Sequence, residues 1–190
     1  MTRYVGRKAL VVGEVTGIGL AIAKRLVEGG ATVLLTVRTA TERAHAVAEL
    51  GSAARVVTPS TVEAALVAQD GTGREATAEG SLDLLFSDAV ATARPLLPHL
   101  RDGSAIVLTS PTPCPDVVRA LAAELVTRGI RVNAVAPGCI EAPGTGAVPL
   151  PPLGRLGAAE EVARAALFLA TEATFTTGVR LPVDGGLAFP

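Results

Sequence analysis

The hydrophobic positions of the chain fall into short aliphatic runs separated by segments with helical spacing. This alternation is typical of βαβ units, in which helices cover both faces of a parallel sheet. The pattern predicts seven strands, at Ala9–Val12, Thr32–Thr36, Arg55–Thr58, Leu82–Phe86, Ala105–Leu108, Arg131–Val135 and Gly178–Pro182. It predicts six helices, at Ile18–Glu28, Thr41–Leu50, Thr61–Gln69, Pro95–Leu100, Asp116–Arg128 and Ala159–Ala170. We therefore predict an α/β fold with a Rossmann-like, doubly wound parallel sheet of seven strands in three α/β/α layers.

Length and composition indicate a single domain over residues 1–190. The chain is 49% hydrophobic, which is enough for a sizeable core, and no repeat or linker divides it. The one long irregular connection is Pro137–Gly157, which is rich in proline and glycine and follows a predicted strand. Ligands bind at that edge of open α/β sheets. The alternative is an ordinary surface loop.

Charge and residue usage exclude several functions. A net charge of −1 provides no basic field for nucleic acid. We find neither an apolar run of the roughly 18 residues that span a membrane nor a signal peptide, and we expect a cytoplasmic protein with no membrane partner. Cys114 and Cys139 lack metal-ligand spacing, and His45 and His99 have no ligand cluster around them, so we expect no metal site.

A glycine-rich segment, VVGEVTGIG at residues 11–19, follows the first predicted strand and opens the first predicted helix. Gly13, Gly17 and Gly19 allow a tight turn and a close approach to phosphate, and the helix that starts near Ile18 directs its free amides to the same place. The segment predicts a dinucleotide-phosphate turn. Alternatively, the glycines only let the helix pack closely on the sheet.

Arg38 follows the second predicted strand, in the segment TVRT at residues 36–39. An acidic residue at this place would accept hydrogen bonds from ribose hydroxyls, whereas an arginine suits a 2′-phosphate. Any cofactor is therefore expected to be NADP(H) rather than NAD(H), unless Arg38 is only a solvated residue near a helix start. Glu14 opposes phosphate binding unless a cation such as Arg38 neutralises it.

Four segments together resemble the short-chain dehydrogenase/reductase family over nearly the whole chain. VGEVTGIG (12–19) resembles the family's T-G-x-x-x-G-I-G, and LDLLFSDAV (82–90) resembles L-D-x-L-V-N-N-A-G. RGIRVNAVAPG (128–138) and the tail from GRLG (154–157) to VDGG (183–186) are nearly consensus. With Arg38, the resemblance implies a cofactor site made of Gly13, Thr16, Gly17, Ile18, Gly19, Arg38, Asp88, Ala89, Pro137, Gly138 and Ile140.

The family transfers a hydride between nicotinamide C4 and a carbonyl carbon, using a Tyr, a Lys four residues later, a Ser and an Asn. The Ser resembles Ser110. The Tyr and Lys fall at Ala123 and Thr127, or are missing altogether when the segment is matched backwards from Arg128. Tyr4 and Lys8 have the right spacing, but they lead into a strand, where successive side chains alternate between faces.

Other positions also depart from the family. A second missing segment, between Ala89 and Gly103, removes the Asn and part of an oligomer contact, so we expect the crossovers around the fourth to sixth strands to be trimmed. Val90 replaces a glycine beside the nicotinamide ribose, Ser87-Asp88 replaces an Asn pair, and Ala142 replaces a Thr.

Ser110 and Asp88 are the candidate catalytic groups, because both follow strand ends at one edge of the predicted sheet. Alternatively, they only make turn and strand-end hydrogen bonds. Cys139 and Glu141 share that edge, but we interpret Cys139 as a small buried side chain and Glu141 as a common family variant.

Three hypotheses follow. The first is a shortened NADP(H)-dependent oxidoreductase that uses Ser110 with water, or Asp88, in place of the tyrosine. The second is a non-catalytic pseudoenzyme that serves as a binding or scaffold subunit, and the third is an isomerase or dehydratase that uses the same cleft. Loss of a positioned proton donor costs about 10²–10⁴-fold in rate, which favours the second. The resemblance also implies a homodimer through the last strand and helix 159–170; no substrate is identified.

Overall fold

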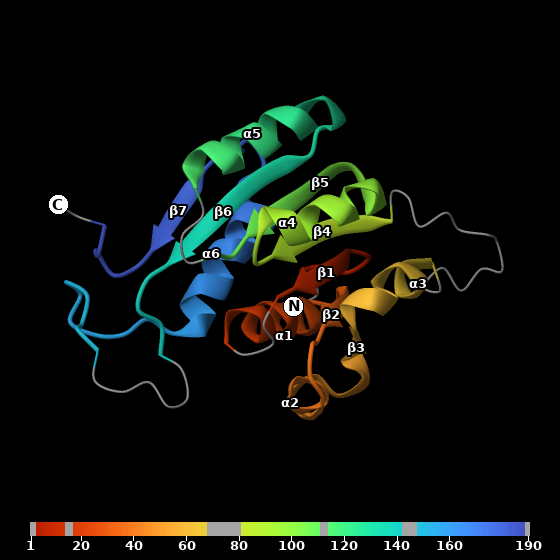
Figure 1. Ribbon diagram of the computed structural model, residues 1–190, viewed down its shortest axis with the longest axis horizontal. Helices are drawn as coiled ribbons and strands as arrows, with labels where there is room; N and C mark the ends of the chain where they lie inside the picture. The colour runs from red at the N-terminus through yellow and green to blue at the C-terminus, as the bar shows by residue number, and fades with distance from the viewer. Residues whose placement is uncertain (1–2, 14–16, 68–80, 111–113, 142–147, 189–190) are drawn as a thin grey trace.

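A computed structural model of the protein describes residues 3–13, 17–67, 81–110, 114–141 and 148–188, and in these residues seven strands form one sheet (Figure 1). The strands are β1 (Lys8–Val12), β2 (Thr32–Thr36), β3 (Ala54–Val57), β4 (Leu82–Ser87), β5 (Leu100–Leu108), β6 (Arg131–Pro137) and β7 (Arg180–Val183). Their order is β3-β2-β1-β4-β5-β6-β7, and all neighbours are parallel. The chain winds outward from β1 to β3, returns to the middle and winds outward again from β4 to β7. The predicted doubly wound fold is confirmed.

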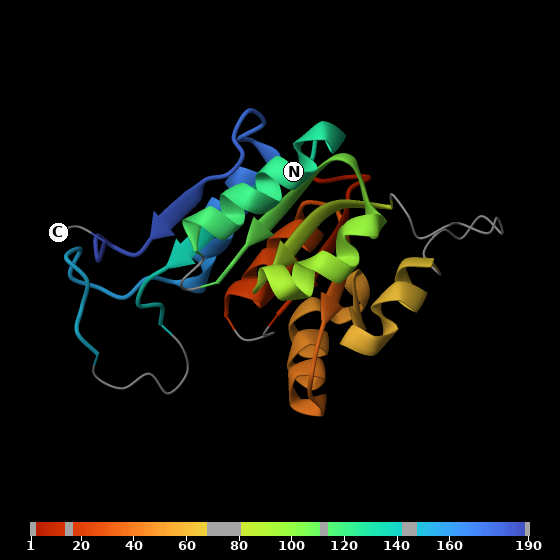
Figure 2. The ribbon, with the colours of Figure 1, turned by 45° about the horizontal axis from the view of Figure 1, so that its top comes forward.

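Helices cover both faces of the sheet (Figure 2). The α-helices of the described residues are α1 (Ile18–Glu28), α2 (Ala40–Leu50), α3 (Val62–Val67), α4 (Val90–Ala93), α5 (Pro115–Leu125) and α6 (Ala159–Thr171). Buried side chains of α1, α2 and α6 belong to one hydrophobic cluster, and those of α3, α4 and α5 belong to the other. The molecule therefore has the predicted three layers.

Rows of hydrophobic side chains run across the four strands β2, β1, β4 and β5. In one row, Leu34, Leu10, Leu85 and Ile106 are paired in register from β2 to β5 and face the cluster of α3 to α5. The next residue of each strand forms a second row, which faces the cluster of α1, α2 and α6. This row consists of Leu35, Val11, Phe86 and Val107. Each such buried side chain contributes about 1.5–3 kcal/mol, so these rows hold the central strands in their register.

Tyr4, the only tyrosine of the sequence, packs at the amino end of the sheet against Gly29, which follows α1. The backbone amide of Tyr4 donates to the carbonyl oxygen of Gly29 at 2.7 Å, and a Cβ on Gly29 would lie only 2.2 Å from Tyr4 Cδ2. Gly29 and Gly30 end α1 as predicted, and Gly30 has a φ of +86° that favours glycine. Close packing on Gly29 thus fixes Tyr4 in the turn that precedes β1.

Several predicted boundaries are wrong around β5. The predicted helix 95–100 is a 3₁₀ segment, Arg94–His99, that follows the short helix α4, and Leu100 already belongs to β5. Pro95 and Pro98 have no backbone N–H to donate, which disfavours a regular α-helix there. Leu100 instead pairs with Leu82, and the register shifts between Leu82 and Leu84.

Other helices differ from prediction only at their ends. The α-helical part of the segment predicted at 116–128 ends at Leu125 and continues as a 3₁₀ turn, Val126–Arg128. The segment predicted at 61–69 forms α3 over 62–67, and positions 68–69 lie outside the described residues. In the part of the chain that the structure describes, we find no helix long and apolar enough to cross a membrane.

Asp83 connects three strands at their amino ends. Its carboxylate is 2% exposed, accepts a hydrogen bond from the backbone amide of Lys8 at 2.7 Å, and pairs with Arg101 at 3.0 Å and Arg7 at 3.6 Å. A buried carboxylate is stable only with such partners. This aspartate of the LDLLFSDAV motif therefore joins β1, β4 and β5 and lies at the edge of the sheet opposite the predicted cofactor site.

Candidate functional site

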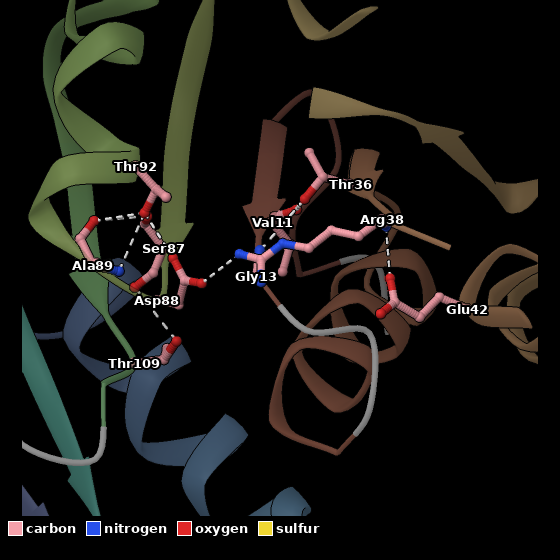
Figure 3. Close-up of polar contacts among 10 residues, drawn as sticks. All are labelled: Val11, Gly13, Thr36, Arg38, Glu42, Ser87, Asp88, Ala89, Thr92 and Thr109. Carbon is pink, nitrogen blue, oxygen red and sulfur yellow. Dashed lines mark hydrogen bonds and ion pairs between the residues drawn. The ribbon is translucent and has the colours of Figure 1, made fainter. Parts of the chain in front are cut away.

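The carboxyl ends of β1, β2 and β4 bring together three of the predicted site residues (Figure 3). Gly13 follows β1, Arg38 follows β2, and Asp88 follows β4. Arg38 Nη2 lies 3.1 Å from Asp88 Oδ2, and the backbone amide of Asp88 donates to the carbonyl oxygen of Val12 at 3.2 Å. The strand order reverses between β1 and β4, which is where open α/β sheets bind ligands.

The N-terminus of α1 points into this region. Gly17 is the N-cap of the helix, with φ +79° and no side-chain capping bond. The first-turn amides of Ile18 and Gly19 have no partner within the helix, and such amides bind anions such as phosphate. A Cβ on Gly17 would meet no atom nearer than 4.0 Å, so its φ rather than crowding requires glycine there. Glu14 and Thr16 lie outside the described residues.

Gly13 is held between neighbouring strand ends. Its backbone amide donates to Thr36 Oγ1 at 3.4 Å, and the Thr36 hydroxyl donates to the carbonyl oxygen of Val11 at 3.4 Å. A Cβ on Gly13, where φ is +143°, would lie 3.2 Å from Asp88 Cβ. Thr36 is 2% exposed and was not recognised from the sequence, although a hydroxyl that ends a buried aliphatic strand is a usable signal.

Arg38 is surrounded by acceptors. Its backbone amide donates to Glu42 Oε2 at 2.6 Å, and the backbone amide of Glu42 donates to the hydroxyl of Thr39, the N-cap of α2, at 3.1 Å. The guanidinium donates to Asp88 from the other side. Arg38 is thus placed to meet an anion, but its guanidinium already pairs with Asp88, and Glu42 accepts from its backbone amide.

Both carboxylate oxygens of Asp88 have partners. Oδ2 accepts from Arg38, and Oδ1 accepts from the Thr92 hydroxyl at 2.7 Å. Thr92 Oγ1 also lies 2.7 Å from Ser87 Oγ and accepts from the backbone amide of Ala89 at 3.2 Å. Thr92 was missed in the sequence, where its position four residues after Asp88 at a helix start was the available signal. These contacts fix Asp88 as part of a polar network.

Ser110 comes to the same edge of the sheet. Leu108, at the end of β5, pairs with Ser87, and the amide of Thr109 donates to the carbonyl oxygen of Ser87 at 2.8 Å. Ser110 is partly exposed, and residues 111–113 beyond it lie outside the described residues. Val90 begins α4 and packs against the hydrophobic cluster of α3 to α5, so it also contributes to the core.

The predicted site residues at the end of β6 lie farther along the carboxyl edge of the sheet, beside β7. Pro137 pairs with Val183, and a Cβ on Gly138 would lie 2.6 Å from the Cα of Asp184. Ile140 bridges Gly157, where a Cβ would lie 2.8 Å from Ile140 Cδ1. Packing against β7 and its following residue accounts for Pro137 and Gly138, and packing against Gly157 accounts for Ile140. Ala142 lies outside the described residues.

A cavity of about 300 Å³ lies beside β7, lined in part by Cys139, Ile140, Pro151, Arg155 and Asp184. Cys139 is partly exposed there rather than fully buried as we expected. Among the described residues, we find no cluster of three His, Cys, Asp or Glu side chains that could hold a metal ion.

The tyrosine and the lysines, which are the residue types that the resembling family uses for proton transfer, lie away from this group of residues. Tyr4 is packed on Gly29 at the amino edge of the sheet, Lys8 begins β1, and Lys24 on α1 pairs with Glu49 at 3.6 Å. These are the only tyrosine and the only two lysines of the sequence. The spacing match of Tyr4 and Lys8 is therefore not an active-site pair.

Comparisons with known proteins assign the family. A family model described as short chain dehydrogenase matches residues 7–101, and one described as enoyl-(acyl carrier protein) reductase matches residues 114–188. The chain belongs to the short-chain dehydrogenase/reductase family. Its fold and its motifs agree with this assignment, and the protein is oxidoreductase-like by descent.

Relatives in this family include several reductases. The chain is 29% identical to the 3-oxoacyl-(acyl-carrier-protein) reductase FabG of Escherichia coli, over 97% of the chain and 98% of the relative. It is 31% identical to galactitol 2-dehydrogenase (L-tagatose-forming) of Cereibacter sphaeroides, over 97% of the chain and 96% of the relative. A crystal structure of a putative betaketoacyl-ACP reductase superposes with a TM-score of 0.74, at 28% identity, covering 96% of this chain and 98% of the other.

The chain spans this domain with fewer residues than its relatives. The alignment with the Escherichia coli protein runs over 247 positions, whereas the chain has 190 residues. The relative therefore carries segments that this chain lacks, as the short crossover around α4 also indicates.

Arg155 connects the loop before α6 to the helix. Its guanidinium donates to both carboxylate oxygens of Glu161, at 2.8 and 2.7 Å, and Glu161 also accepts from the backbone amide of Ala158 at 2.9 Å. The hydrogen bond from Arg155, followed by the one from Ala158, lowers the pKa of Glu161 to about 2.

The contacts of Glu161 should make stability depend on pH. Because its pKa is lowered in the folded protein, the stabilisation is complete above the ordinary value of 4.5 and is lost as pH falls toward about 2. Glu161→Gln should lower the urea midpoint at pH 7, and the difference from wild type should narrow steadily below pH 4.5. Urea unfolding followed by circular dichroism measures this, and a difference that stays constant down to pH 3 would contradict it.

Proposed function

We propose that this short-chain dehydrogenase/reductase binds an NADP(H)-type dinucleotide through the adenosine and phosphate half and lacks the family's proton-transfer chemistry. One observation carries the proposal. Gly17, the first-turn amides of α1 and Arg38 face the carboxyl edge of the sheet, whereas Tyr4 packs against Gly29 at the amino edge. Phosphate-binding groups are thus retained at the edge from which the acid–base pair is missing.

The residues present fit the phosphates of such a cofactor. The open space at Gly17 and the uncapped amides of Ile18 and Gly19 suit a pyrophosphate, and Arg38 suits a 2′-phosphate. When bound, the nicotinamide would supply a hydride at its C4 atom.

The protein's own candidate residues, Ser110 and Asp88, are poorly suited to donate or accept a proton. Ser110 can donate a hydrogen bond to a carbonyl oxygen, but a hydroxyl is a weak acid unless a neighbour lowers its pKa. Both oxygens of Asp88 are already occupied by Arg38 and Thr92, which disfavours Asp88 as a base. A missing proton donor costs about 10²–10⁴-fold in rate. We therefore favour a nucleotide-binding pseudoenzyme over a shortened oxidoreductase.

Arg38→Ala tests the binding part of the proposal. We expect NADPH to bind the wild-type protein and the variant to bind it roughly tenfold more weakly, because a charge-assisted hydrogen bond contributes about 1.5 kcal/mol or more. Fluorescence titration and calorimetry measure the two dissociation constants.

Arg94→Ala is the matched control for that experiment. Arg94 makes a similar surface ion pair with Glu124, at 3.0 Å and with 55% of its side chain exposed, compared with 3.1 Å and 50% for Arg38. Its removal should leave the affinity for NADPH unchanged. Wild-type protein that binds no NADPH at millimolar concentration would rule out the nucleotide site.

Turnover is a separate prediction. With NADPH bound, we expect no oxidation above the enzyme-free rate across a panel of reactive quinones and ketones, followed at the nicotinamide absorbance. A kcat in the usual enzymatic range, about 1–10³ s⁻¹, would contradict the pseudoenzyme proposal. The Ser110→Ala variant would then decide whether Ser110 carries the activity.

We also propose a homodimer formed through α6 and β7. β7 is an edge strand, Phe168 on α6 is about half exposed, and Phe175, which follows α6, is fully exposed. Exposed aromatic side chains and an unpaired strand edge are typical of an association surface.

Phe168→Glu should convert the dimer to a monomer, because the charge would be buried without a partner at the interface. Val126→Glu, at a similarly exposed position after α5, is the control and should remain dimeric. Light scattering during size-exclusion chromatography measures the mass. A wild-type protein that is monomeric at high micromolar concentration would argue against the dimer.

A further inference from the structure

The ion pair of Arg38 and Asp88 spans the point at which the sheet changes its winding direction. Arg38 follows β2, Asp88 follows β4, and β1 lies between these two strands. Figure 3 shows the Arg38 side chain extending from the β2 side to Asp88 near Gly13. Asp88 lies beside Gly13, since a Cβ on that glycine would be 3.2 Å from Asp88 Cβ and 3.6 Å from Oδ2.

Asp88 is held in the position from which it contacts Arg38. Its Oδ1 accepts from Thr92 at 2.7 Å, and its backbone amide is bonded to Val12 at 3.2 Å. On the other side, the backbone amide of Arg38 is bonded to Glu42 at 2.6 Å. The pair therefore joins two anchored segments.

The pair is also weak enough to open. The side chains are 50% and 33% exposed, and exposed ion pairs are screened by solvent and contribute little to stability. A phosphate that approaches Arg38 must either displace the Asp88 carboxylate or bind beside it. In the first case the pair is lost, and in the second two negative groups lie close together. Both effects weaken binding of a 2′-phosphate.

We propose that Asp88 is a specificity-determining residue, which lowers the preference of the site for nucleotides with a 2′-phosphate by competing for the guanidinium of Arg38. This inference rests on the proposed nucleotide site at the carboxyl edge. It assigns the preference to a residue after β4, far in sequence from the arginine that meets the phosphate.

The preference is measured with two probes, adenosine 2′,5′-bisphosphate and adenosine 5′-monophosphate, which differ only by the 2′-phosphate. Calorimetry provides both dissociation constants, and their ratio is the preference. Asp88→Asn should raise this ratio about three- to tenfold, because the acceptor charge is removed while the size of the side chain is kept. Arg38→Ala should bring the ratio close to one. In the Arg38→Ala background, Asp88→Asn should leave the ratio unchanged.

Asp102→Asn is the matched control. Asp102 pairs with Arg128 at 2.9 Å on the surface, at the start of β5 and at the opposite edge of the sheet. This variant loses a similar ion pair and should keep the wild-type ratio. Thermal unfolding checks that each variant is folded, and Asp88→Ser, also neutral and small beside Gly13, replaces Asp88→Asn if that variant does not fold.

The outcomes separate this inference from the function on which it rests. An unchanged ratio in Asp88→Asn, with both probes binding, overturns the role of Asp88 and leaves the nucleotide site intact. An equal gain in affinity for both probes also overturns it, because Asp88 would then act on the shared 5′-phosphate rather than through Arg38. If neither probe binds any variant at millimolar concentration, the proposed nucleotide site itself is wrong.

Discussion

The pairing of β1 with β4 is the contact on which the rest of the structure depends. These strands are far apart in the sequence but lie side by side in register, from Ala9 with Leu84 to Val12 with Ser87. The pairing turns the chain back toward the middle of the sheet, so the later crossovers build the other half. It also places Gly13 against Asp88 at one end and the Lys8 amide against Asp83 at the other. Both the fold and the candidate site follow from this one pairing.

The chain keeps the family's fold although it is shorter than its relatives, because the core lies in the strands. The in-register rows of buried side chains from β2 to β5 need only crossovers long enough to join parallel strands. The crossover from β4 to β5 satisfies this with α4 and a 3₁₀ segment. The resemblance to the family places the tyrosine and lysine on a covering helix, outside these rows. Such a chain can therefore lose the acid–base groups and remain folded.

At the carboxyl edge of the sheet, a neighbouring carboxylate lowers the attraction of Arg38 for anions. Arg38 is the cation expected at a 2′-phosphate position, yet its backbone amide is bonded to Glu42 and its guanidinium to Asp88. Its attraction for an anion is therefore lower than the residue type alone indicates, since the Asp88 carboxylate offsets part of the positive charge. The identity of one residue predicts which ligand group it suits, whereas the neighbours determine how strongly it binds that group.

The sequence by itself determined the seven strands, most helices and the doubly wound fold, because these depend on local periodicity and on glycine spacing within a few residues. It also showed that the tyrosine and lysine are missing from their usual segment. Boundaries near Pro95 and Pro98 were wrong, because pairing of Leu100 with Leu82 extends β5. Only the tertiary structure decided that Asp88 meets Arg38, that Gly138 packs on Asp184, and that Tyr4 packs on Gly29. These contacts join residues far apart in the chain, and no local pattern encodes the distance between them.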